Sequence, residues 1–158
     1  MNKLVLLAAA AGLSIGPVNA PGGAGQATKP SLARAIHVHQ VSAAEDKLGH
    51  RYLYPGRQVK QAATGYRLSQ ESAYFVMAFV DGGSACGELA LRVRVLAGAS
   101  ALGERGLVLS DGGGGGPVVV PIRPARGPTG NTALTVELLD AKGRIDQWST
   151  TAVVVGSD

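Results

Sequence analysis

The chain has 158 residues, a formal net charge of +4, one cysteine and seven aromatic residues (four Tyr, two Phe and one Trp). This length fits a single domain, and one cysteine excludes both an internal disulfide and a multi-cysteine zinc site. Hydrophobic residues make up 46% of the chain, enough for a core, and the 23 glycines and 8 prolines favour turns over long helices.

The N-terminus has the layout of a secretory signal peptide. A basic start at residues 1–3 precedes an uncharged apolar run over 4–15, and Val18-Asn19-Ala20 has the small-x-small pattern of a signal peptidase site. The apolar run is shorter than the roughly 20 residues of a membrane span. We therefore predict a signal peptide over 1–20, no membrane span after its removal, and a periplasmic or extracellular location.

The exact cleavage point is left open by the residue that follows Ala20. Pro21 fits a peptidase active site poorly because its ring fixes φ and removes an N–H, so a cut as late as Ala27 is an alternative. The glycine-rich stretch 21–32 is expected to be a flexible lead-in. Residues 33–158 are expected to form one domain.

Alternation of apolar and polar residues with a period of two dominates the rest of the chain, as in half-buried strands. Strands are predicted at 35–41, 74–80, 88–96, 107–109, 118–122, 132–140 and 145–155. Short strands separated by glycine and proline turns are typical of an antiparallel sandwich. We predict an all-β fold, an immunoglobulin-like β-sandwich of about seven strands.

Some segments carry more specific expectations. The apolar run 74–80 is expected at the centre of a sheet or buried on both faces. Pro121 interrupts its strand and indicates an edge or a bulge. The turn 141–144 contains Gly143, which can supply the positive φ of a hairpin. Segment 58–72 is compatible with a strand, a loop or a short helical turn.

Two histidines are the candidate metal ligands. His37 and His39 lie two residues apart, so both rings would project from the same face of a strand as Val41, with Ile36 on the opposite face. That spacing can seat two imidazoles on one metal ion, with His50 as a third ligand. Two partly exposed strand histidines without a metal are the favoured interpretation, and no cofactor is expected.

No combination of catalytic residues stands out. Cys86 opens a strand, but no histidine base lies near it in the sequence, so a half-buried structural thiol is favoured, with pairing to another chain left open. The glycine run 112–116 leads into Pro117 and a strand, which excludes a P-loop. GxSxG and HExxH motifs are absent. We predict a protein without enzymatic activity.

The basic residues are dispersed along the chain. Removal of the signal peptide takes away Lys3 and no acid, so the formal net charge falls from +4 to +3. Nucleic-acid binding usually needs a dense basic face, so it is not expected. Glu88, Arg92 and Arg94 share one face of the strand at 88–96, and this face is either a solvated surface or a charged strip that contacts another protein.

Several short motifs between residues 66 and 155 occur in a recognisable order. They are Cys86-Gly87-Glu88 before an alternating strand, Gly98-Ala99-Ser100, Leu107-Val108-Leu109, Leu134-Thr135-Val136 through Asp140, and Gln147-Trp148. In order and spacing they resemble the small periplasmic curli assembly proteins of the C and H type. The enteric members have a Cys-x-Cys pair where Cys86 stands alone, so a redox role is not expected.

The resemblance implies a fold and a function. Those proteins are immunoglobulin-like sandwiches that keep curli amyloid subunits soluble during export. A member would act without catalysis, through transient contact with subunits whose strand edges would otherwise pair with like edges. We predict a protein partner of this kind and place the contact on Glu88, Arg92 and Arg94. Residues 28–65, with all three histidines, lie outside the resemblance.

Other functions are left open by the sequence. A surface module that binds glycans or metal would need exposed rings gathered on one face, drawn from Tyr52, Tyr54, Tyr66 and Trp148. Burial of Trp148 would count against it. A structural subunit of a surface appendage would need a long unpaired strand edge and a free N-terminal segment. An enzyme would need the histidines to converge with Cys86 or an acid.

Overall fold

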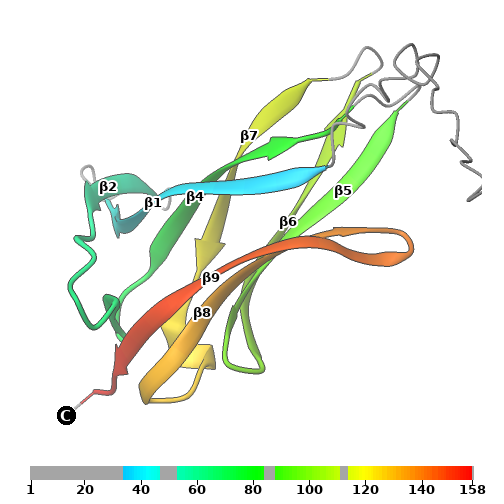
Figure 1. Ribbon diagram of the computed structural model, residues 1–158. Coiled ribbons are helices and arrows are strands. Elements are labelled where there is room, and N and C mark those ends of the chain that lie inside the picture. The colour runs from blue at the N-terminus through cyan, green and yellow to red at the C-terminus, as the bar shows by residue number, and fades with distance from the viewer. Residues whose placement is uncertain (1–33, 47–52, 84–87, 111–113, 158) are drawn as a thin grey trace, which may run out of the picture. The chain divides into compact units, whose positions relative to one another are not determined.

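The computed structural model describes residues 34–46, 53–83, 88–110 and 114–157, which form nine strands and one 3-10 turn (Figure 1). The strands make two sheets that share one core, so the predicted all-β sandwich is confirmed. These ranges hold no helix that could cross a membrane. The predicted signal peptide and lead-in, as well as His50 and Cys86, lie outside the described residues.

The nine strands divide into sheets of four and five. The four-stranded sheet has the order β2-β1-β4-β7, from β1 (Ala35–Glu45), β2 (Tyr54–Gln58), β4 (Tyr74–Asp81) and β7 (Gly115–Ile122). The five-stranded sheet has the order β3-β9-β8-β5-β6, from β3 (Tyr66–Ser69), β5 (Leu89–Ala97), β6 (Ser100–Leu109), β8 (Gly130–Asp140) and β9 (Gly143–Val155). The 3-10 turn Pro124–Arg126 lies between β7 and β8.

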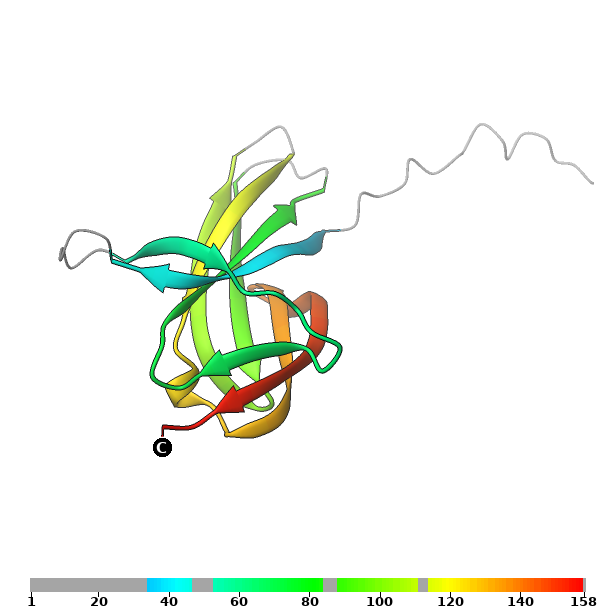
Figure 2. The same ribbon diagram turned by 90° about the vertical axis from the view of Figure 1, so that its left-hand side faces the viewer.

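The strand count exceeds the expected number of about seven. The two additional strands are β2, which ends at the start of the ambiguous segment 58–72, and β3, which lies within it. β2 was not predicted because it contains Pro55 and Gly56, two residue types that are rare in strands. β6 begins at Ser100, whereas the pattern predicted a strand only at 107–109. The pairing of β3 with β9 is parallel, and Figure 2 shows these two strands side by side.

A β-bulge changes which residues of β1 face the core. The sequence pattern placed Val41 on the same face as His37 and His39, opposite Ile36. The register of β1 with β4 shifts directly after Val38, where one extra residue is inserted. Beyond the bulge, residues that the simple alternation would place on the outer face point into the core, and the reverse. Ile36 and Val41 are therefore both buried, while the two histidines are exposed.

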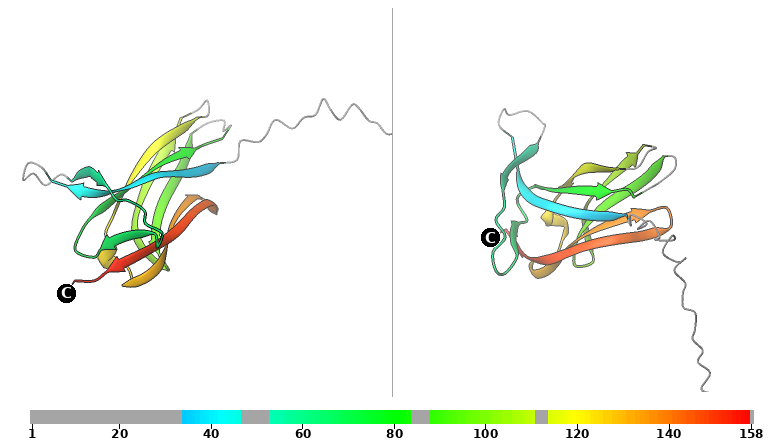
Figure 3. Two further views of the ribbon diagram at one scale, coloured as in Figure 1. Left: turned by 60° about the vertical axis from the view of Figure 1, so that its left-hand side comes forward. Right: turned by 45° about the horizontal axis from the view of Figure 1, so that its top comes forward.

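The inner faces of both sheets meet in one apolar core. Its fully buried members include Val41, Val76, Val80, Val120 and Ile122 from the four-stranded sheet, and Leu68, Val93, Val95, Leu134, Val136 and Leu138 from the other. Leu91, Val93 and Val95 of β5 thus share the inner face of their sheet with Leu134, Val136 and Leu138 of β8. β1 also crosses close to the start of β9, where the N–H of Ile36 donates to Asp146 Oδ2 at 2.9 Å (Figure 3).

The outer edge of β7 is poor in hydrogen-bond donors. Its ladder with β4 runs without a register shift, and the N–H of Arg123 points away from β4 to the Leu102 carbonyl at 3.2 Å. Because N–H directions alternate along a strand, the odd-numbered residues of β7 direct theirs outward. Pro117 and Pro121 have no N–H to offer there. The edge position expected for Pro121 is confirmed, and this edge is a poor template for an added strand.

Candidate functional site

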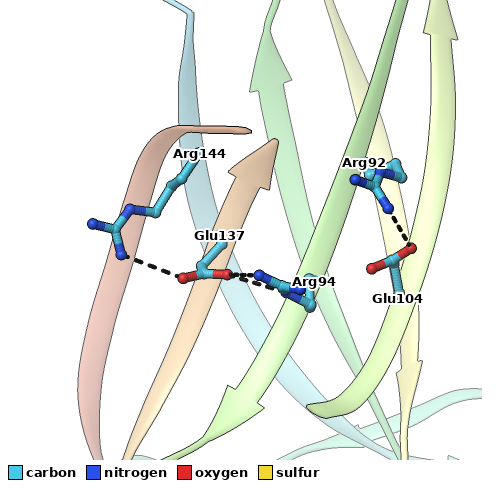
Figure 4. Close-up of polar contacts among 5 residues, drawn as sticks. All are labelled: Arg92, Arg94, Glu104, Glu137 and Arg144. Atoms are coloured by element: carbon cyan, nitrogen blue, oxygen red, sulfur yellow. Dashed lines mark hydrogen bonds and ion pairs between the residues drawn. The ribbon is translucent and has the colours of Figure 1, made fainter. Parts of the chain in front are cut away.

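The predicted contact residues of β5 belong to an ion-pair network on the outer face of the five-stranded sheet (Figure 4). Arg94 donates to Glu137 Oε2 from Nε at 3.1 Å and from Nη2 at 2.8 Å. Arg144 approaches the other carboxylate oxygen of Glu137 at 3.4 Å, and Arg92 pairs with Glu104 at 3.4 Å. The structure therefore brings Arg92 and Arg94 together on one face, and each guanidinium forms an ion pair with a glutamate of a neighbouring strand.

Strand register explains why Glu137 is the hub of this network. Arg94 lies opposite Glu137 on β8 and opposite Glu104 on β6. The side chain of Glu137 is only 9% exposed, so its charge needs the two arginines beside it. Glu88 is exposed, precedes β5 and forms no ion pair within the described part of the chain. The sequence pattern did not single out Glu137, because its role depends on β8 lying beside β5.

The two candidate metal-ligating histidines are on the outer face of the four-stranded sheet. His37 lies opposite Phe79 of β4, and His39 falls at the bulge. No group of three or more His, Cys, Asp or Glu residues able to hold a metal ion occurs in the described ranges. His50, the predicted third ligand, is not among those residues.

The outer face of the four-stranded sheet carries an uncharged surface that sequence reasoning missed. Phe75, Met77 and Phe79 alternate along β4 and lie opposite Pro121, Val119 and Pro117 of β7; we call these six residues the apolar outer face. Phe79 is 37% exposed. The continuous apolar run at 74–80 predicted burial on both faces or a central position. The structure places β4 centrally, and no other described element forms a layer over this second face.

A groove of about 220 Å³ continues the apolar outer face. It shares Phe75 and Pro121 with that face and adds Leu53, itself among the exposed large hydrophobic residues, and the buried Leu102. Glu104, Arg123 and Arg126 also line the groove. An exposed apolar area with a polar rim is the usual character of a protein-contact surface.

The tryptophan and the three tyrosines that the structure describes do not form an exposed stacking platform. Trp148 is partly buried against the core, Tyr66 and Tyr74 are buried, and Tyr54 is half-buried. Burial raises the pKa of the Tyr66 hydroxyl. The position of Trp148 counts against the glycan-binding alternative, because sugars stack on exposed rings. Tyr52 lies outside the described residues.

Comparison with known proteins finds similarity only among solved structures. The chain matches no protein-family model and no curated protein. Similar structures include the exo-chitosanase CsxA from Amycolatopsis orientalis, with 12% identity over 75% of this chain and a TM-score of 0.43. A glycosyl hydrolase family 2 member from Bacteroides cellulosilyticus (10% identity) and a β-glucuronidase from glycoside hydrolase family 2 (6% identity) each match 52% of this chain with a TM-score of 0.35. The chain spans only 12%, 12% and 10% of the length of these three proteins.

Proposed function

We propose that this protein is exported, has no enzymatic activity and acts by transient contact with other proteins, keeping curli-type amyloid subunits from aggregating. Three features support the proposal. The N-terminal pattern is that of a signal peptide, and the motifs between 66 and 155 resemble curli assembly proteins. The β-sandwich also presents an apolar outer face beside a strand edge that is poor in donors.

The combination of that face and that edge carries the proposal. An exposed apolar sheet surface, with Phe79 next to Met77 and Val119, can hold an apolar segment of another chain. Amyloid grows when strand edges pair with like edges. Because Pro117 and Pro121 remove outward donors from β7, a bound subunit finds only a poor template for strand addition there. Such a surface can bind a subunit without starting the strand pairing by which a fibril grows.

The charged strip of Glu88, Arg92 and Arg94 is the second candidate contact surface. Contact through Arg94 would compete with its two hydrogen bonds to Glu137, at 2.8 and 3.1 Å. Desolvating a pair that is already satisfied adds little net affinity. Binding at the apolar outer face breaks no ion pair, so we assign the contact with the amyloid subunit to that face.

Fibril growth of a curli major subunit tests this assignment. We expect a substoichiometric amount of the protein without residues 1–27 to lengthen the thioflavin-T lag time. Phe79→Ser should lose most of the delay, because burial of a phenyl ring contributes about 1.5–3 kcal/mol, or roughly tenfold or more in affinity. Val108→Ser is the matched control, since Val108 is 62% exposed on β6 of the other sheet.

The outcomes separate the two surfaces. Unchanged lag times with the unaltered protein would overturn the chaperone proposal. A delay that survives Phe79→Ser but is lost in Arg92→Glu/Arg94→Glu would move the contact to the charged strip. Near-ultraviolet circular dichroism of each variant would show that the fold is intact.

A further inference from the structure

A second, larger cleft lies where β2 and the residues that follow it approach β3 and the start of β4. Its volume is about 760 Å³. The lining residues are Ala43, Arg57, Gln58, Val59, Lys60, Arg67 and Tyr74, and we call this the basic cleft. It shares no residue with the apolar outer face or with the network around Glu137.

The lining of the basic cleft is positively charged. It contains three basic side chains, Arg57, Lys60 and Arg67, and no acidic one. None of the three forms an ion pair within the part of the chain that the structure describes, in contrast to Arg92 and Arg94. Glu45 lies close by, and its carboxylate accepts from the backbone N–H of Arg57 at 2.9 Å, which leaves one negative charge beside the three basic side chains. Three like charges facing one space repel each other, and an anion placed between them removes that repulsion.

The walls of the basic cleft are anchored to different sheets. Arg57 belongs to β2 of the four-stranded sheet, while Arg67 belongs to β3 of the five-stranded one. The N–H of Val59 donates to the Val41 carbonyl at 2.8 Å. The connecting segment is then tied to the other sheet by Gln61, whose Nε2 donates to Thr150 Oγ1 at 2.8 Å. The backbone that carries Arg57, Lys60 and Arg67 is therefore tied to both sheets, while their exposed side chains stay free to adjust to a ligand.

The volume and lining of the basic cleft favour an extended peptide over a single phosphate or an acidic sugar. Its volume of about 760 Å³ lies in the range of ligand-binding clefts and exceeds the need of one phosphate. Its single aromatic residue, Tyr74, is only 7% exposed and accepts the Ser69 N–H at 2.8 Å, so no free ring is offered to a sugar. The bordering strands β2 and β3 are both sheet edges, where extended peptides can add main-chain contacts.

We propose that the basic cleft binds an extended acidic peptide segment, with Arg57 and Lys60 holding carboxylates from one wall and Arg67 from the other. Ala43 and Val59 supply apolar contact for the intervening side chains. This site is independent of the apolar outer face, and it goes beyond the proposed function.

Fluorescence anisotropy with short labelled peptides tests this proposal on the protein without residues 1–27. We expect a Glu-Val-Glu-Val-Glu peptide to bind about tenfold more tightly than its Gln-Val-Gln-Val-Gln counterpart, with affinity falling as salt is added. Arg57→Gln/Arg67→Gln should weaken binding about tenfold. The control Arg105→Gln/Lys142→Gln removes the same net charge from exposed residues outside the cleft and should have an effect below about twofold.

Equal losses in the two double variants would overturn the proposal, because they would show non-specific attraction to net charge. Tighter binding of polygalacturonate or inorganic phosphate than of the Glu peptide would also overturn it and assign the cleft to another anion. Lys60→Gln, a single exposed change, serves as the second variant, with an expected loss of about threefold. Phe79→Ser should bind the Glu peptide normally, so failure here and failure in the fibril assay are distinguishable.

Discussion

Gly65→Ala should destabilise the protein by about 2–5 kcal/mol, from about 1–2 for a left-handed alanine and about 1–3 for overpacking. Gly65 has a φ of +97° and immediately precedes β3. A Cβ built there overlaps the backbone carbonyl of Thr151 on β9. Because the obstruction is main chain, no change of side-chain rotamer relieves it. Urea unfolding followed by circular dichroism measures the loss.

Gly130→Ala separates the two contributions. Gly130 has nearly the same φ, +94°, but nothing lies within 4 Å of a Cβ built on it. Only the backbone cost of about 1–2 kcal/mol is therefore expected. Equal losses at the two glycines would contradict the close approach of Gly65 to β9.

The consequence of Gly65→Ala extends to the basic cleft. β3 is held to β9 by a short parallel ladder, from Tyr66–Ala152 to Ser69–Val155, and it positions Arg67. Displacing β3 should weaken binding of the acidic peptide and increase amide hydrogen exchange in β3. Gly130→Ala should leave both unchanged, since Gly130 lies at the start of β8 and does not line the cleft.

Local patterns predicted the parts of the fold that depend on neighbouring residues. β5 and β8 were found from alternation alone, because β5 alternates between buried and more exposed residues and β8 directs Leu134, Val136 and Leu138 into the core. Pro121 marked an edge because it lacks an N–H. Gly143 marked the β8–β9 hairpin because a positive φ, here +135°, is required there. In each case the physical cause lies within a few residues of the signal.

The features that were missed depend on strands that are distant in the sequence. The bulge after Val38 exists only relative to β4, and it reversed the predicted face of Val41. Phe79 belongs to a run whose pattern predicted burial on both faces or a central position, but Phe79 itself is 37% exposed among the described residues. Arg57 and Arg67 converge only because consecutive strands join different sheets. Sequence alternation carries no information about any of these pairings.

Glu137→Gln should cost about 1–3 kcal/mol, the range for losing a partly buried carboxylate that holds charged hydrogen bonds. The change preserves shape and removes the charge shared by Arg94 and Arg144. The estimate lies below that for a fully buried pair because the two arginine side chains are 37% and 57% exposed. Urea unfolding at low and high salt measures it, and the loss should persist at high salt because Glu137 is shielded from solvent.

Glu104→Gln is the matched control on the same face. Its partner Arg92 is 55% exposed and 3.4 Å away, so the expected loss is below about 1 kcal/mol. Losses of equal size would contradict the central role of Glu137. Glu137→Gln also removes the charge that pairs with Arg94 while keeping Arg94 itself. If the charged strip binds the amyloid subunit, the fibril lag should lengthen further in this variant. If the apolar outer face does so, the lag should match that of the unaltered protein.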